Sequence, residues 1–88
     1  MSTPKWVVLH VQAKRNHTLD LEFADGKKGN FDFKPLLVKP MYAKLSNISY
    51  FLGAFVSCGS VAWDEEIDIA PEYLYENSIT EALYSTHT

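Results

Sequence analysis

The sequence has little cysteine and no long apolar segment. Its only cysteine, Cys58, cannot form a disulfide within the chain, so we expect folding to depend on apolar burial in a reducing compartment. The first residues lack the apolar segment of a signal peptide. The longest apolar stretch, 50–56, is far shorter than the ~18–20 residues of a membrane-spanning helix. These absences predict a cytoplasmic protein that does not enter a membrane.

The patterns of several kinds of chemical site are also absent. The sequence has no glycine-rich phosphate loop, and its three histidines lack the paired spacing of a zinc site. The acidic cluster at 64–68 lacks the spacing and the closing glutamate of a calcium loop. Nothing in the sequence brings Cys58 next to a histidine, as nucleophilic catalysis would require. We therefore expect no catalytic, metal-binding or cofactor-binding residues, no cofactor and no enzyme activity.

Basic residues are missing from the second half of the chain. All eight Lys and Arg lie between Lys5 and Lys44, together with four acids, which gives 8 − 4 = +4. The residues from 45 onward contain seven acids and no base, which gives −7 and a total of −3. The simpler interpretation is that the two halves pack together and neutralise one another. The alternative is an acidic face that is offered to a basic partner.

The 88 residues predict one domain, 1–88, with a single core. Residues 6–13 are β-branched and apolar, and they predict a strand with Val7, Leu9 and Val11 on one face and Trp6, Val8 and His10 on the other. Strict alternation at 18–23 predicts a second strand, whose inward side chains are Leu19, Leu21 and Phe23.

A hairpin turn is predicted at Asp25-Gly26, because glycine supplies the positive φ that a tight turn needs. Residues 30–33 alternate again, with Phe31 and Phe33 inward, and complete a three-stranded antiparallel meander. Prolines at 35 and 40 then exclude a central strand and a long helix. We expect short helical turns across 35–51.

The second half predicts a hairpin of 52–57 and 60–63 around a turn at 58–59, followed by a short extended piece at 67–69. Pro71 is suited to the first position of a helix, which Asp68 could cap. Residues 78–81 have the form of a capping box, which could restart a helical turn carrying Ile79, Ala82 and Leu83. The expected architecture is α+β: a meander, short helical turns, a second hairpin and a C-terminal helix.

The order of these segments resembles family 2442 of the bacterial domains of unknown function. The matching segments are 7–11, 19–26, 31–37, Phe51, 61–63, 67–71 and 74–75. Where that family often has a Pro-Asn-Gly-like turn after the tryptophan, this chain has Asp64-Glu65-Glu66. The resemblance implies a small, stand-alone bacterial module. Some relatives carry an appended helix-turn-helix, and others belong to gene pairs suspected of toxin–antitoxin behaviour. The resemblance supplies no catalytic residue.

The leading hypothesis is a non-enzymatic protein-interaction module, with a partner encoded nearby or a homodimer. The side chains expected to form its interaction surface are Asp64, Glu65, Glu66, Glu72, Tyr73 and Glu76. Trp63 is either part of the core, as its strand position favours, or an anchor for the partner.

Two other hypotheses stay open. A nucleic-acid-associated accessory domain would use Lys14, Arg15, Lys27 and Lys28. These residues occupy turns at opposite ends of the meander and do not form one stripe, and the pI near 5.5 also argues against nucleic-acid binding. A carboxylate-based enzyme would require a cleft lined by acids.

Overall fold

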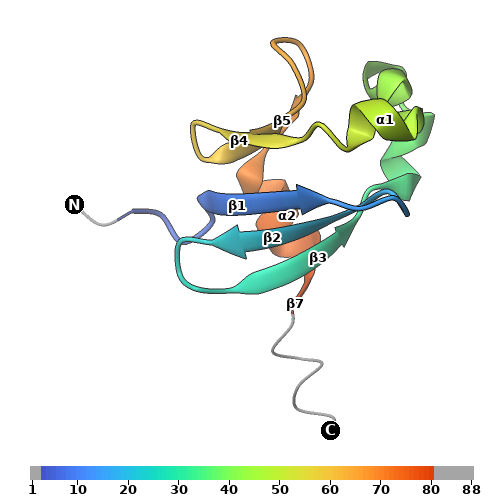
Figure 1. Ribbon diagram of the computed structural model, residues 1–88. Helices are drawn as coiled ribbons and strands as arrows, with labels where there is room; N and C mark the ends of the chain where they lie inside the picture. Colours follow the sequence, from blue (N-terminus) through green and yellow to red (C-terminus); the bar gives the residue numbers. More distant parts are fainter. Residues whose placement is uncertain (1–2, 81–88) are drawn as a thin grey trace, which may run out of the picture.

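The computed structural model describes residues 3–80 (Figure 1). The strands of this part of the chain are β1 (Val8–Ala13), β2 (Thr18–Phe23), β3 (Lys28–Asp32), β4 (Phe55–Ser57), β5 (Ser60–Ala62), β6 (Asp68–Ile69) and β7 (Ile79–Thr80). The helical segments are the 3₁₀ helices η1 (Lys34–Val38) and η2 (Pro40–Ser46) and the α-helices α1 (Ile48–Phe51) and α2 (Pro71–Asn77).

The strands form two antiparallel sheets, one in the order β1-β2-β3-β7 and one in the order β4-β5-β6. The β4–β5 hairpin lies above β1 in Figure 1, η1, η2 and α1 gather at one end, and α2 lies behind the larger sheet. The predicted α+β architecture is therefore confirmed, with its meander, short helical turns, second hairpin and C-terminal helix. Among residues 3–80, none of the helices has the length and apolar character needed to cross a bilayer.

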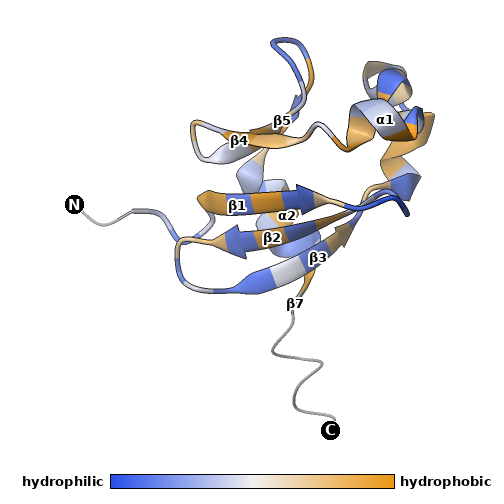
Figure 2. Cartoon of the chain, viewed as in Figure 1, coloured by the Kyte–Doolittle hydropathy of each residue, from blue (hydrophilic) through white to orange (hydrophobic). Residues whose placement is uncertain are grey.

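The alternating segment 18–23 forms β2 as predicted. Its inward side chains Leu19, Leu21 and Phe23 are buried, and Figure 2 shows the alternation of apolar and polar residues along this sheet. The third strand begins earlier than predicted and ends at Asp32. Phe33 is fully buried, as expected, but lies just before η1.

The prediction for the faces of β1 is wrong at Val8 and Leu9. Val8 is buried although His10, predicted on the same face, is exposed, and Leu9 is exposed although Val11, predicted to share its face, is half-buried. The reason is a β-bulge, since Val8 pairs with Phe23 while His10 pairs with the adjacent Glu22, which inserts one extra residue into β1. The N–H of Val8 donates a hydrogen bond to the carbonyl of Gly59 in the β4–β5 turn (2.8 Å). The start of β1 therefore joins the two sheets.

The segment between the sheets is built from short helices, as the prolines predict. Pro35 and Pro40 stand at the first turns of η1 and η2, where a missing N–H costs no helical hydrogen bond. Asn47 caps α1, because its Oδ1 accepts a hydrogen bond from the N–H of Ser49 (3.0 Å). The strand predicted at 52–57 is shorter than expected, since Leu52 and Gly53 donate hydrogen bonds back into α1.

Two predictions for the C-terminal part are wrong. Pro71 begins α2 as expected, but Asp68 does not cap it, because Asp68 lies in β6 and the residue at the cap is Ala70. Ile79 lies in β7 and pairs with Asn30, rather than restarting a helix. The open edge of β3 provides backbone partners that a short helical turn could not match. Ala82 and Leu83 lie outside the described residues.

Trp63 belongs to the core. Its side chain is only 6% exposed, and its ring lies 5.3 Å from that of Phe33 and 5.8 Å from that of Phe51, measured between centroids. Its Nε1–H donates a hydrogen bond to the carbonyl of Phe51 (2.8 Å). The ring is therefore fixed by packing and by a buried polar contact, and it is not free to anchor a partner.

Candidate interaction surface

The structure places the six residues predicted for the interaction surface on two elements. Three of them, Asp64, Glu65 and Glu66, lie in the loop between β5 and β6, which we call the acidic loop (64–66). The others, Glu72, Tyr73 and Glu76, lie on the exposed side of α2, which we call the α2 surface. In Figure 1 the loop rises away from the larger sheet, whereas α2 lies behind that sheet.

Asp64 is a structural member of the acidic loop. Its Oδ1 accepts hydrogen bonds from the N–H groups of Glu66 and Ile67, both at 2.8 Å. Its Oδ2 accepts a hydrogen bond from the hydroxyl of Tyr50 and lies 3.8 Å from Nζ of Lys44. The carboxylate closes the loop and ties it to the α1 region, so it is not free to bind a partner.

The same contacts control ionisation. The hydrogen bond from Tyr50 and those from the loop backbone hold the pKa of Asp64 below its usual value. The hydrogen bond to Asp64 also raises the pKa of Tyr50, because it stabilises the protonated phenol. Asp64 therefore stays ionised while it holds the loop.

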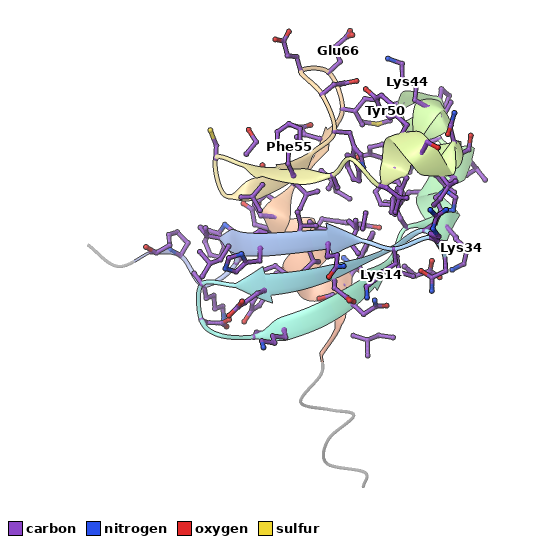
Figure 3. The ribbon with its side chains drawn as sticks, viewed as in Figure 1. Lys14, Lys34, Lys44, Tyr50, Phe55 and Glu66 are labelled. Carbon is purple, nitrogen blue, oxygen red and sulfur yellow. The ribbon has the colours of Figure 1, made fainter. Side chains whose placement is uncertain are left out.

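Glu65 and Glu66 form the tip of the acidic loop and are exposed. Within the described residues, neither side chain has an ion-pair partner or accepts a hydrogen bond. Figure 3 shows Glu66 at the end of the loop, away from both sheets. These two carboxylates, unlike that of Asp64, are available to a partner.

The α2 surface combines two carboxylates with an aromatic ring. Glu72 and Glu76 are exposed and stand four residues apart, so they share one face of the helix, whereas Leu74 is buried. Tyr73 is 43% exposed, and its ring packs against that of Phe31 in a T-shaped arrangement, with 5.8 Å between centroids. This surface therefore offers negative charge around a partly exposed apolar ring.

Within residues 3–80, one ion pair joins the two halves of the chain. Among the described residues, Lys44 and Asp64 form the only ion pair that joins the basic first half to the acidic second half (3.8 Å). The closer pairs, Lys14 with Asp20 (3.1 Å) and Lys34 with Asp32 (3.0 Å), lie within the first half. The negative charge of the second half, as far as residue 80, is therefore left largely uncompensated at contact distance.

The structure also brings together basic residues that local sequence pattern does not group, because Lys14 and Arg15 lie near lysines of η1 and η2 rather than near Lys27 and Lys28. In the structure, the turn between β1 and β2 lies against η1 and the end of η2. Nζ of Lys34 donates a hydrogen bond to the carbonyl of Asn16 (3.2 Å), and Nε2 of His17 bonds to the carbonyl of Leu45 (2.9 Å).

These contacts gather a group that we call the basic end, composed of Lys14, Arg15, Lys34, Lys39 and Lys44. Figure 3 shows Lys14 and Lys34 at the lower part of the end that carries η1 and η2, and Lys44 at its upper part, beside Tyr50. Val38 and Met41, at the junction of the two 3₁₀ helices, are 85% and 61% exposed. The signal in the sequence was a lysine at every fifth position from 34 to 44.

No group of three or more His, Cys, Asp or Glu side chains in the described range 3–80 is arranged as metal ligands would be. The family model described as "Protein of unknown function (DUF2442)" matches residues 8–80, from the start of β1 to the end of β7. This match confirms the resemblance drawn from the sequence. No curated protein and no solved structure matches the chain.

Proposed function

The chain belongs to the DUF2442 family, whose function is unknown, and we propose that it is a non-enzymatic interaction module that binds a basic protein. Its binding residues are the exposed members of the acidic loop, Glu65 and Glu66, and the α2 surface. The observation that carries this proposal is the uncompensated charge of these acids among the described residues.

An uncompensated acidic surface suits a basic partner for two reasons. Its field raises the rate of encounter with a positively charged protein and disfavours acidic ones. Tyr73 adds a rigid ring with a hydroxyl, and tyrosine is among the residues that contribute most to binding energy at interfaces. The charges therefore supply specificity, and the ring supplies contact area.

The family resemblance supports a partner encoded by a neighbouring gene, as in toxin–antitoxin pairs. In this proposal the protein acts in the bacterial cytoplasm as the neutralising member of such a pair. Asp64 is excluded from the binding residues, because it holds the loop and its replacement would change the loop itself.

Co-expression with the product of the adjacent gene tests the proposal. We expect a complex that co-purifies at low salt and is weakened by Glu65→Lys with Glu66→Lys, and by Glu72→Lys with Glu76→Lys, because each pair reverses the charge that meets the partner. Gln12→Lys, which adds positive charge on exposed β1, is the control and leaves the complex intact.

Two results would count against the proposal. If no product of the adjacent gene co-purifies at low salt, the paired-gene version is wrong. If a complex forms but tolerates all four reversals, the partner binds elsewhere, and the acidic loop and α2 surface are not the interface.

The basic end favours a second candidate function, a nucleic-acid-associated accessory domain. In the basic end, the β1–β2 turn, which carries Lys14 and Arg15, lies against η1, which begins at Lys34 and is followed by Lys39. Phosphate contacts by these lysines would make binding fall steeply with salt. A salt titration of binding with Lys34→Ala and Lys39→Ala tests this function. The matched control is Lys27→Ala with Lys28→Ala, at the opposite end of the meander.

A further inference from the structure

We propose that this chain binds a second copy of itself, with the basic end of one copy on the α2 surface of the other. The proposal uses the α2 surface but does not rest on a foreign partner. It assigns a role to the exposed apolar residues of the basic end, which the proposed function leaves unexplained.

The basic end has the composition of a docking surface. Val38 is 85% exposed and Met41 is 61% exposed, which makes them the two most exposed large apolar side chains among the described residues. Lys39 lies between them in the sequence. Lys34 and Lys44 lie on the two flanking 3₁₀ helices, where Lys34 forms an ion pair with Asp32 (3.0 Å) and Lys44 with Asp64 (3.8 Å). An exposed apolar centre with a charged rim is the usual arrangement of an interaction site.

The α2 surface has the opposite arrangement of charge. Tyr73 is 43% exposed between Glu72 and Glu76 on the helix, and Ile79 on the adjoining β7 is 53% exposed. Two apolar centres can therefore meet while a positive rim faces a negative one. This complementarity in both apolar area and charge is what a second copy offers.

Within the described part of one copy, no ion pair joins the basic end to the α2 surface. Among the described residues, the sole ion pair between a basic-end lysine and an acid of the second half is that of Lys44 with Asp64, in the acidic loop and not on α2. Glu72 and Glu76 are thus left for an intermolecular contact.

A nucleic acid would satisfy the lysines of the basic end but would leave Val38 and Met41 without the apolar contact that a tyrosine ring provides. The observations therefore favour a protein surface that carries both carboxylates and an aromatic side chain. Closed two-fold dimers are the commonest symmetric assembly, and in such a dimer this contact would be made twice.

Sedimentation velocity of the full chain, across protein concentration, tests the proposal. We expect association that increases with concentration and weakens when salt is raised from about 0.1 M to about 1 M, which shortens the Debye length from about 10 Å to about 3 Å. Lys34→Glu with Lys39→Glu, and separately Glu72→Lys with Glu76→Lys, should each raise the dissociation constant about tenfold or more.

Mixing the two charge-reversed proteins is the decisive measurement. Each should be monomeric alone, while the mixture regains association, because reversed charges then face one another again. Gln12→Lys, on the exposed side of β1 and away from both surfaces, is the control and leaves self-association unchanged. Circular dichroism establishes that all variants fold.

A monomer at every concentration in low salt would overturn the proposal. So would association that the reversals leave unchanged, or a mixture that stays monomeric. Association that nuclease abolishes would assign the basic end to nucleic acid instead. Failure of self-association with intact binding of the adjacent gene's product would leave the proposed function standing.

Discussion

The loops at Asp25 and at Asp64 are built on the same plan from unrelated sequences. In each, the aspartate accepts a hydrogen bond from the backbone N–H two residues later, that of Lys27 (2.9 Å) or Glu66 (2.8 Å). In each, the other carboxylate oxygen accepts a hydrogen bond from a distant tyrosine, Tyr75 or Tyr50. Both aspartates therefore fix a loop to a remote segment.

The two loops also share a basic side chain over the tyrosine. Nζ of Lys27 lies 3.9 Å from the centroid of the Tyr75 ring, and Nζ of Lys44 lies 5.5 Å from that of Tyr50. In both loops the tyrosine hydrogen bond is the main cause that lowers the pKa of the aspartate. The combination of Asp, Tyr and Lys therefore occurs twice in the molecule, and each time it stabilises an ionised carboxylate.

The loops differ in what they expose. The Asp25 loop turns tightly through Gly26, whereas the Asp64 loop uses a second backbone hydrogen bond, from Ile67, and presents Glu65 and Glu66 at its tip. A run of acids in a sequence can therefore contain one structural carboxylate and two available ones. The hydrogen bonds of the folded chain, and not the sequence, distinguish the structural carboxylate from the other two.

The largest expected effect comes from the residue before the Asp64 loop. Trp63→Ala should destabilise the protein by about 3–5 kcal/mol, because it removes a buried ring and its hydrogen bond to Phe51. Chemical denaturation measures the loss. Tyr73→Ala, at a partly exposed ring, is the comparison and should cost clearly less. Equal losses would contradict the assignment of Trp63 to the core.

The Asp25 loop can be tested by a substitution that strains its backbone at Gly26. Gly26 has φ +89°, and a Cβ placed there would meet nothing within 4 Å, so Gly26→Ala carries only the conformational cost of about 1–2 kcal/mol. Thermal or urea unfolding checks this value. Gly26→Asn should cost less, because asparagine tolerates the left-handed region better. If alanine and asparagine behave alike, conformational strain is not the cause.

The smallest expected effect is on the dependence of stability on pH. The pKa values of Asp25 and Asp64 are lowered in the folded protein from an ordinary value of 3.8. Their contribution to stability is therefore complete above about pH 3.8 and is lost as pH falls through the lowered values. Asp25→Asn and Asp64→Asn should each flatten the acid-induced fall in melting temperature.

Glu65→Gln is the matched control for this measurement, since the Glu65 side chain accepts no hydrogen bond from the described residues. It should leave the acid dependence close to that of the unaltered protein. If the melting temperature of both asparagine variants falls with acid as it does in the unaltered protein, the two tyrosine contacts do not stabilise the ionised carboxylates.

The meander and the core could be predicted because local patterns determine them. The alternation at 18–23 and the Asp25-Gly26 turn act over a few residues, and burial of Leu19, Leu21 and Phe23 followed from them. The bulge in β1 could not be predicted in this way, because it accompanies a hydrogen bond to Gly59, a residue far along the chain.

The second half and the candidate surfaces were harder to predict for the same reason. Ile79 lies in a sequence with the form of a capping box, but it pairs with β3. The residues around Ile79 do not indicate that the edge of β3 is open to pairing. The structural role of Asp64 depends on Tyr50, and the basic end depends on the packing of the β1–β2 turn against η1. The sequence identifies the charged side chains, but tertiary contacts determine which of them can bind a partner.

The hydrogen bond between Val8 and Gly59 has a consequence for how the protein opens. It links the first strand of one sheet to the hairpin of the other, and Val8 is itself part of the shared core. Neither sheet can then separate without exposing the apolar surface of both, so the two should unfold as a single cooperative unit. In native-state hydrogen exchange, the amide proton of Val8 should be as strongly protected as those in the middle of β2.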